Sequence, residues 1–198
     1  AYSTTTRPGD AKYKDINNDG VINDLDKTII GQGHPKAIGG LGNDLSYKNF
    51  DLNFFLQFNI GNNILNANRM IFENAHGRRH TNMFASYINR WSEDNPTSDI
   101  PRAQAAGSDQ YSSFYVEDGS FLRLKSVALG YTLPTRLTNS LHIVAARISI
   151  SAENLFVLTN YSGNDPEVST RNTVLTPSFD WSPYPRSRDY SLSVNLTF

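Results

Sequence analysis

The segment 188–198 constrains the fold most strongly, because apolar and small polar side chains alternate along it. Successive side chains of a β-strand point to opposite faces, so this segment has one apolar and one polar face. A strand that crosses a membrane in a β-barrel needs about 9–11 residues, apolar toward lipid and polar toward the lumen. The apolar positions are Tyr190, Leu192, Val194, Leu196 and the final Phe198. The pattern predicts a transmembrane strand, which we expect to close an outer-membrane barrel.

Composition excludes several other classes of protein. The chain of 198 residues has a mean hydropathy of −0.45 and no apolar run near the roughly 18 residues of a membrane helix, which excludes a helical membrane protein. Lys and Arg (18) balance Asp and Glu (19), so we expect no nucleic-acid partner. Without cysteine the chain has neither a disulfide nor a thiolate metal site.

Four further segments have strand patterns, at 37–47, 51–60, 121–133 and 143–156. The segment 51–60 alternates most regularly, and Phe55 is its one exception. Its apolar positions are Leu52, Phe54, Leu56, Phe58 and Ile60. The polar positions of these strands are expected to line the barrel lumen, and they are Asp51, Asn53, Gln57, Asn59, Ser149 and Ser151.

The connections between the strands alternate in length. The segments 47–50 and 134–142 are short, whereas 61–119 and 160–186 are long, and residues 1–35 form another polar stretch. Outer-membrane barrels have short periplasmic turns and long extracellular loops. The order therefore places the short connections in the periplasm and the three long segments outside the cell.

These patterns predict an all-β protein: about five antiparallel strands of a large transmembrane β-barrel with long, partly helical extracellular loops. Residues 1–35 form a loop, and residues 36–198 supply the strands. The smallest barrels of this kind have about 8 strands, so we expect the chain to be part of a longer protein. The alternative is a secreted, calcium-stabilised β-sandwich that binds glycans, which would be soluble without detergent.

Several blocks of the sequence resemble the SusC/RagA family of TonB-linked outer-membrane importers. The longest block is VEDGSFLRLKSV at 116–127, followed by LGYTLP at 129–134. Others follow in the family's order over essentially the whole chain. They are GDAKYKD at 9–15, Arg90-Trp91 with NPT at 95–97, IPR at 100–102, ENLF at 153–156, YSGNDPE at 161–167 and YPR at 184–186.

This resemblance implies the C-terminal part of a barrel of about 22 strands in the bacterial outer membrane. It also implies import of glycans or peptides together with a SusD-like surface lipoprotein as the lid. Energy would come from TonB through a TonB box and a plug domain, which we do not recognise in this sequence. By the same resemblance, Phe198 would be the signal read by the barrel-assembly machinery.

The segment 15–26 has the spacing of a calcium-binding loop. Calcium prefers six to eight hard oxygen ligands, and Gly20 permits the sharp turn that such loops need. The ligands would be the side chains of Asp15, Asn17, Asp19 and Asp26 and the backbone carbonyl of Val21. A turn closed by its own Asn and Asp side chains, without an ion, is the alternative.

No candidate catalytic group has persuasive spacing, so we expect no enzyme. His76 and His80 stand four residues apart, but Gly77 between them favours loop histidines over a metal site. A glycosidase needs two acids that flank one bond in a cleft, and nothing in the sequence places two acids in that way. We therefore interpret the acid pairs Glu117-Asp118 and Asp165/Glu167 as turn and loop residues. A short amphipathic helix is expected around 84–91, where Phe84, Tyr87, Ile88 and Trp91 have helical spacing.

Overall fold

The computed structural model describes residues 6–74, 80–103, 110–140, 142–170 and 176–198. The chain forms two compact units. The loop unit comprises Ala1–Gly33, Asn63–Glu117 and Val168–Pro183, and the sheet unit comprises His34–Asn62, Asp118–Glu167 and Tyr184–Phe198. The five strands lie in the sheet unit, together with residues 160–167 and 184–186 of the second long segment, and most of the other predicted loop residues lie in the loop unit.

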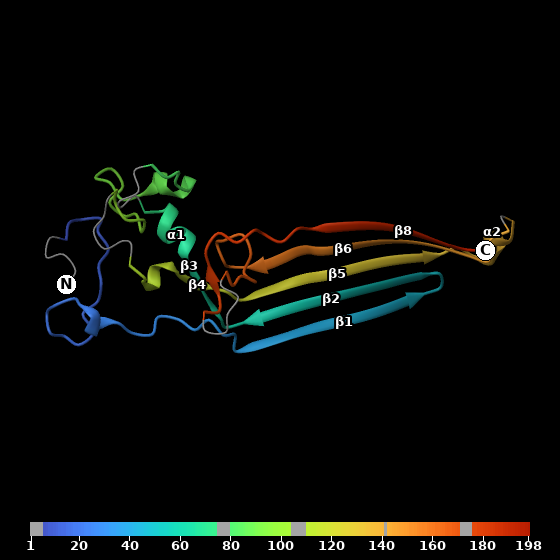
Figure 1. The fold of residues 1–198 in the computed structure, drawn as a ribbon, viewed down its shortest axis with the longest axis horizontal. Helices are drawn as coiled ribbons and strands as arrows, with labels where there is room; N and C mark the ends of the chain where they lie inside the picture. The colour runs from blue at the N-terminus through green and yellow to red at the C-terminus, as the bar shows by residue number, and fades with distance from the viewer. Residues whose placement is uncertain (1–5, 75–79, 104–109, 141, 171–175) are drawn as a thin grey trace. The chain divides into compact units, whose positions relative to one another are not determined.

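The sheet unit is built on five antiparallel strands in the order β1-β2-β5-β6-β8 (Figure 1). This arrangement confirms the predicted antiparallel sheet, and β1 has the predicted bounds. The strands are β1 (Ala37–Tyr47), β2 (Phe50–Ile60), β5 (Phe121–Thr132), β6 (Ala145–Thr159) and β8 (Asp189–Thr197).

The short connections all lie at one end of this sheet. Tyr47 is paired with Phe50 across the turn between β1 and β2, where Lys48 has a φ of 53°. The connection from β5 to β6 contains α2 (Thr135–Ser140). The long connections leave from the opposite end, as the sequence predicts.

Strand β5 carries a bulge at Lys125 that the sequence pattern does not reveal. Leu56 of β2 is opposite Leu124, but the next residue toward the start of β2, Phe55, is opposite Ser126. The apolar positions of β5 change from even to odd numbers at this point, from Leu124 to Val127 and beyond. An extra residue reverses the alternation locally, so the bulge keeps the apolar side chains on one face.

The loop unit contains a small sheet in the order β4-β3-β7, in which β3 and β7 are parallel.

No helix among the described residues is long and apolar enough to span a membrane. The helix expected around 84–91 is a short 3₁₀ helix, and α1 was not predicted. The elements are η1 (Asp24–Asp26), β3 (Asn63–Asn66), α1 (Ala67–Phe72), η2 (Ala85–Asn89), η3 (Ser113–Tyr115), β4 (Val116–Asp118, whose last residue belongs to the sheet unit) and β7 (Phe179–Asp180).

A charged network anchors α1 in the loop unit. The guanidinium of Arg69 lies 2.8 Å from Glu73 and 3.0 Å from Glu117, and it also packs on the ring of Phe114. Burial tends to lower the pKa of Arg69, but hydrogen bonds and charges from both carboxylates raise it above its usual value. Asn66 caps the helix by accepting a hydrogen bond from the backbone N–H of Arg69.

Candidate functional site

One face of the five-stranded sheet is apolar from edge to edge. Directly opposed residues form a continuous row across all five strands: Leu45, Leu52, Leu129, Ile150 and Leu192. A second row consists of Tyr47, Phe50, Tyr131, Ile148 and Val194. These side chains are largely uncovered, and Leu192 is 73% exposed. Such a broad apolar surface needs lipid or protein to cover it.

The other face of the sheet is polar. In one row Asp51 lies opposite Gly130, which in turn is opposite Ser149. In the next row Asn53 and Ser151 flank Ala128. The register places all of the expected lumen residues on this one face: Asp51, Asn53, Gln57, Asn59, Ser149 and Ser151.

An ion pair crosses the polar face between strands that are not neighbours. The guanidinium of Arg147 on β6 makes two contacts with the carboxylate of Asp51 on β2, at 2.5 and 2.6 Å. Both side chains pass over Gly130 of the intervening strand β5, where a Cβ would come within 2.7 Å of Asp51 Oδ1. The small residue at 130 therefore makes room for the pair, a relationship that local sequence patterns do not contain.

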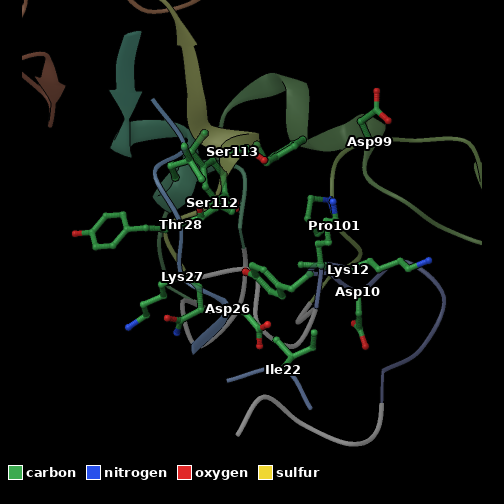
Figure 2. Close-up of a pocket in the computed structure, with 18 of the residues that line it drawn as sticks. Asp10, Lys12, Ile22, Asp26, Lys27, Thr28, Asp99, Pro101, Ser112 and Ser113 are labelled. Carbon is green, nitrogen blue, oxygen red and sulfur yellow. The ribbon is translucent and has the colours of Figure 1, made fainter. Parts of the chain in front are cut away.

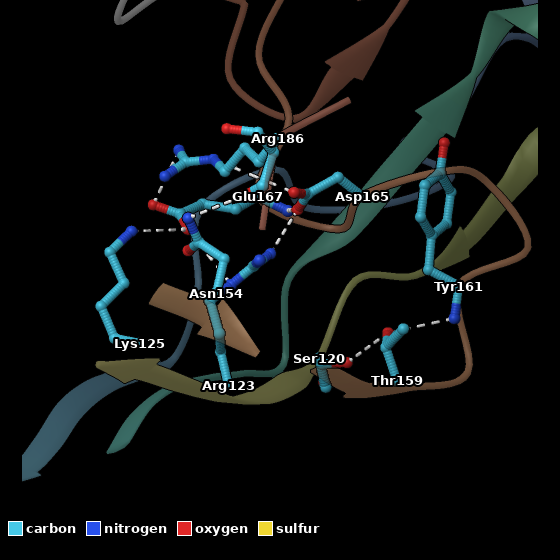
Figure 3. Close-up of polar contacts among 10 residues, drawn as sticks. Ser120, Arg123, Lys125, Asn154, Thr159, Tyr161, Asp165, Glu167 and Arg186 are labelled. Atoms are coloured by element: carbon cyan, nitrogen blue, oxygen red, sulfur yellow. Dashed lines mark hydrogen bonds and ion pairs between the residues drawn. The ribbon is translucent and has the colours of Figure 1, made fainter. Parts of the chain in front are cut away.

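A charged cluster gathers at the end of the polar face from which the long connections leave (Figure 3). It consists of Arg123 and Lys125 from β5, Asp165 and Glu167 from the chain that follows β6, and Arg186 from the chain that precedes β8. Arg123 and Asp165 contact each other at 2.5 Å, and Arg186 contacts Glu167 at 3.0 Å. The sequence predicts only turn or loop roles for Asp165 and Glu167, because no local pattern joins them to Arg123 and Arg186.

The Asp/Asn loop, residues 15–26, is closed by its own side chains. Asp15 accepts hydrogen bonds from the backbone N–H groups of Asn18 and Gly20, at 2.6 and 2.8 Å. Asp26 accepts from the N–H groups of Ile16 and Asn23, both at 2.8 Å. Asp15 and Asp26 therefore direct their oxygens into the loop.

These hydrogen bonds account for the electrostatics of the loop. The N–H groups of Asn23 and Ile16 stabilise the ionised form of Asp26 and lower its pKa below the usual value of 3.8. Lys27 lowers the pKa of Asp24 in the same direction, first through its hydrogen bond and then through its charge. Among the described residues no group of three or more His, Cys, Asp or Glu side chains is arranged to hold a metal ion. Calcium binding by Asp15, Asn17, Asp19, Val21 and Asp26 stays a prediction.

A pocket of about 940 Å³ adjoins the Asp/Asn loop within the loop unit (Figure 2). The loop contributes Ile22 and Asp26 to its lining, and residues 98–101 and 112–115 line other parts. Asp10 also lines the pocket; its side chain is only 1% exposed and is ion-paired at 2.7 Å with Arg102. The pocket combines apolar, aromatic and charged residues, so its lining identifies no single class of ligand.

The remaining predicted residues occupy separate positions. Glu117 contacts Arg69, and Asp118 accepts hydrogen bonds from the backbone and the hydroxyl of Ser120. His80 is described, whereas His76 lies outside the described residues, so their pairing stays untested. Phe198 follows β8 and is 83% exposed. Its role as an assembly signal stays a prediction.

Comparison with known proteins identifies relatives over nearly the whole chain, although no protein-family model matches. The chain is 35% identical to TonB-dependent receptor P3 of Formosa agariphila over 96% of its length and 19% of that receptor. It is 36% identical to receptor P26 of the same organism, again over 96% of its length and 20% of the receptor. It is 24% identical to TonB-dependent receptor SusC of Bacteroides thetaiotaomicron over all of its length and 18% of SusC.

Solved structures agree with these relatives. The structure of the RagAB peptide transporter matches with a TM-score of 0.72 at 30% identity, over 86% of this chain and 18% of that one. The RagAB peptide importer in its open-open state matches with a TM-score of 0.76 at 29% identity, over 94% and 20% of the two chains. The chain thus spans about a fifth of the length of the relatives it matches.

The matches agree with the two-faced sheet, whose uncovered apolar face suits lipid. They argue against the alternative interpretation, in which the alternating segments form a soluble β-sandwich. The chain belongs to the SusC/RagA family of TonB-dependent receptors, which are proteins of the outer membrane.

Proposed function

We propose that this chain forms part of the wall and the outer loops of an importer that carries glycans or peptides across the outer membrane. The observation that carries the proposal is the two-faced sheet. Its apolar rows cross five strands without interruption, and the opposite face bears Asp51, Asn53, Ser149 and Ser151. The apolar face would meet lipid and the polar face the lumen. The role is architectural rather than catalytic.

The alternation of short and long connections supports a direction of insertion. The short connections lie at the Tyr47–Phe50 end, and the long ones lead from the other end into the loop unit. We assign the short connections to the periplasm and the loop unit to the cell exterior.

The proposed partners follow from the family. A SusD-like lipoprotein would cover the outer loops, and TonB would act through another part of the receptor. One solved relative is a peptide transporter, which supports peptides as the cargo. Glycans are the other class that the family resemblance implies.

The proposal is tested by labelling single cysteines in the full-length receptor, in membranes of its own cell. The chain has no cysteine of its own, and any elsewhere in the receptor would be replaced by serine. Ile150→Cys and Ser151→Cys are matched because they are neighbours on β6 that face opposite ways. A water-soluble maleimide should label Ser151→Cys, whereas Ile150→Cys should react only with a lipid-soluble maleimide. Equal labelling by the water-soluble reagent would overturn the assignment of the faces.

The direction of insertion is tested by labelling intact cells with a maleimide that does not cross the membrane. Asp24→Cys, in the loop unit, should react on intact cells. Asn49→Cys, in the turn between β1 and β2, should react only after the outer membrane is permeabilised. The reverse pattern would refute the direction without affecting the assignment of the faces.

A further inference from the structure

The charged cluster brings together residues from three separate blocks of the sequence. Arg123 and Lys125 belong to the block 116–127, Asp165 and Glu167 to the block 161–167, and Arg186 to the block 184–186. These blocks carry the family resemblance, yet the proposed wall role assigns no task to their charged residues. Because these charged residues meet on the polar face, we looked for a role that they share.

The centre of the cluster is buried and its edge is open. The side chain of Arg123 is 4% exposed and that of Asp165 13%, whereas Arg186 is 40% exposed. Glu167 connects the two zones, because Arg123 Nε lies 3.6 Å from its Oε2 and Arg186 Nη2 lies 3.0 Å from its Oε1. Lys125 approaches the same Oε2 at 3.9 Å. The cluster therefore ties both arms of the connection between β6 and β8 to strand β5.

Irregularities in two strands accompany the cluster. Lys125 is the bulged residue of β5, and β6 has a matching irregularity, because Glu153 and Phe156 lie opposite residues only two apart. Within it Asn154 has a φ of 51° and donates a side-chain hydrogen bond of 3.2 Å to the backbone carbonyl of Ser187. The returning arm is thus held by β6 as well as by the charges.

We propose that the charged cluster is an electrostatic clamp that holds residues 160–167 and 184–188 against the polar face of the sheet. Arg123 lies opposite Gln57 and Val157 on that face, so the clamped segments lie over its polar rows. That this face is the lumen rests on the proposed function. If so, residues 160–167 and 184–188 narrow the lumen, and Arg123 and Arg186 are the residues that position these two segments.

The clamp is tested by hydrogen–deuterium exchange of the full-length receptor in detergent. Arg186→Gln removes the contacts to Glu167 and Asp165 from the open side of the cluster, without leaving a cavity at its buried centre. Deuterium uptake by peptides from 160–170 and 182–188 should rise several-fold at early times, because local opening no longer breaks these ion pairs. Peptides from β5 and β2 should be unchanged, which would show that the sheet is intact.

The matched control is Arg188→Gln, because Arg188 forms no ion pair within the described part of the chain. Arg186→Lys should raise uptake less than Arg186→Gln, since it keeps the charge beside Glu167 and Asp165. High salt should raise uptake in the parent receptor more than in Arg186→Gln. Unchanged uptake in Arg186→Gln, an equal rise in Arg188→Gln or an equal rise in Arg186→Lys would overturn the clamp. None of these outcomes depends on which face meets water, which the cysteine labelling tests separately.

Discussion

Arg147 and Asp51 are bound to each other across an intervening strand, and Gly130 beneath them provides the space. The partners are 96 residues apart in the sequence and lie on β6 and β2. Their pairing links three strands of the polar face by side chains, in addition to the backbone ladders.

Gly130→Ala should displace this ion pair without disrupting the sheet. The new Cβ would meet the ends of two flexible, partly exposed side chains, which can move aside. Arg147→Gln should give the same small loss of stability, and the double variant should be no worse than either single one. Denaturant unfolding of the full receptor in detergent would check this. Additive losses would show that Gly130 has a role independent of the pair.

Leu192→Arg should impair assembly more than Ser193→Arg. Leu192 ends the apolar row on β8, and Arg on the lipid face of a barrel has a cost that grows with depth, from at most about 1 kcal/mol near the interfaces to about 2–4 kcal/mol at the midplane. Ser193 is next to it but lies in a polar row, where an added charge meets water. The heat-modifiable mobility of the folded barrel on a gel would report assembly. Equal defects would contradict the assignment of the two faces.

Arg69→Met should destabilise the loop unit by roughly 3 kcal/mol, because two carboxylates would lose their shared cation. Glu73 is 8% exposed and Glu117 13%, so water compensates little for the loss. Arg69→Lys should retain part of the stability, since it keeps the charge but not both contacts. Limited proteolysis of the loops on intact cells would rank the variants. If Arg69→Met and Arg69→Lys were equally sensitive, packing rather than charge would be responsible.

The Asp/Asn loop should loosen in acid. The folded state lowers the pKa of Asp26 below 3.8, so its contribution to stability is complete above about pH 4 and is lost as the pH falls through the folded pKa. Asp26→Asn should remove the same contribution at neutral pH. Hydrogen exchange of peptides from 13–26, corrected for the intrinsic effect of pH, would follow the change. Exchange that is independent of pH in this range would contradict the role of Asp26.

Calcium should bind the parent receptor, and Asp15→Asn combined with Asp19→Asn should abolish that binding. Two of the anionic ligands would lose their charge, and charge determines much of the affinity of such loops. Asp24→Asn is the matched control, because Asp24 lies in the same loop but is paired with Lys27 and is not a predicted ligand. Calorimetric titration with calcium, after removal of metal by a chelator, would measure the difference. Equal heats from all three proteins would refute the predicted ligand set.

The strands could be predicted because their information is local. The segment 37–47 was expected and is observed with the same bounds, since alternation alone identifies a strand with two unlike faces. The bulge at Lys125 could not be predicted, because a change in the numbering of apolar positions looks the same whether a strand bulges or ends. Only the pairing of β5 with β2 and β6 shows that the apolar side chains before and after the bulge lie on the same face.

The loops were harder to predict for the opposite reason. Helix α1 has only six residues, too few to be stable alone, and it depends on the contacts of Arg69. Within the charged cluster Arg123 and Asp165 are 42 residues apart, and no local pattern joins them. The motif blocks of the sequence indicated that these residues belong to a family, but only the fold shows that they meet.

The small sheet of the loop unit has a consequence for how these receptors can change. Its central strand β3 begins the connection between β2 and β5, β4 ends that connection, and β7 comes from the connection between β6 and β8. A third segment, which contains Gly33 and precedes β1, is linked to this sheet as well. The hydroxyl of Ser178, next to β7, donates a hydrogen bond to the backbone carbonyl of Gly33. Grafting a single loop from another receptor would leave exposed strand edges behind. Diversification of this region, in evolution or in the laboratory, therefore has to exchange these loops as a set.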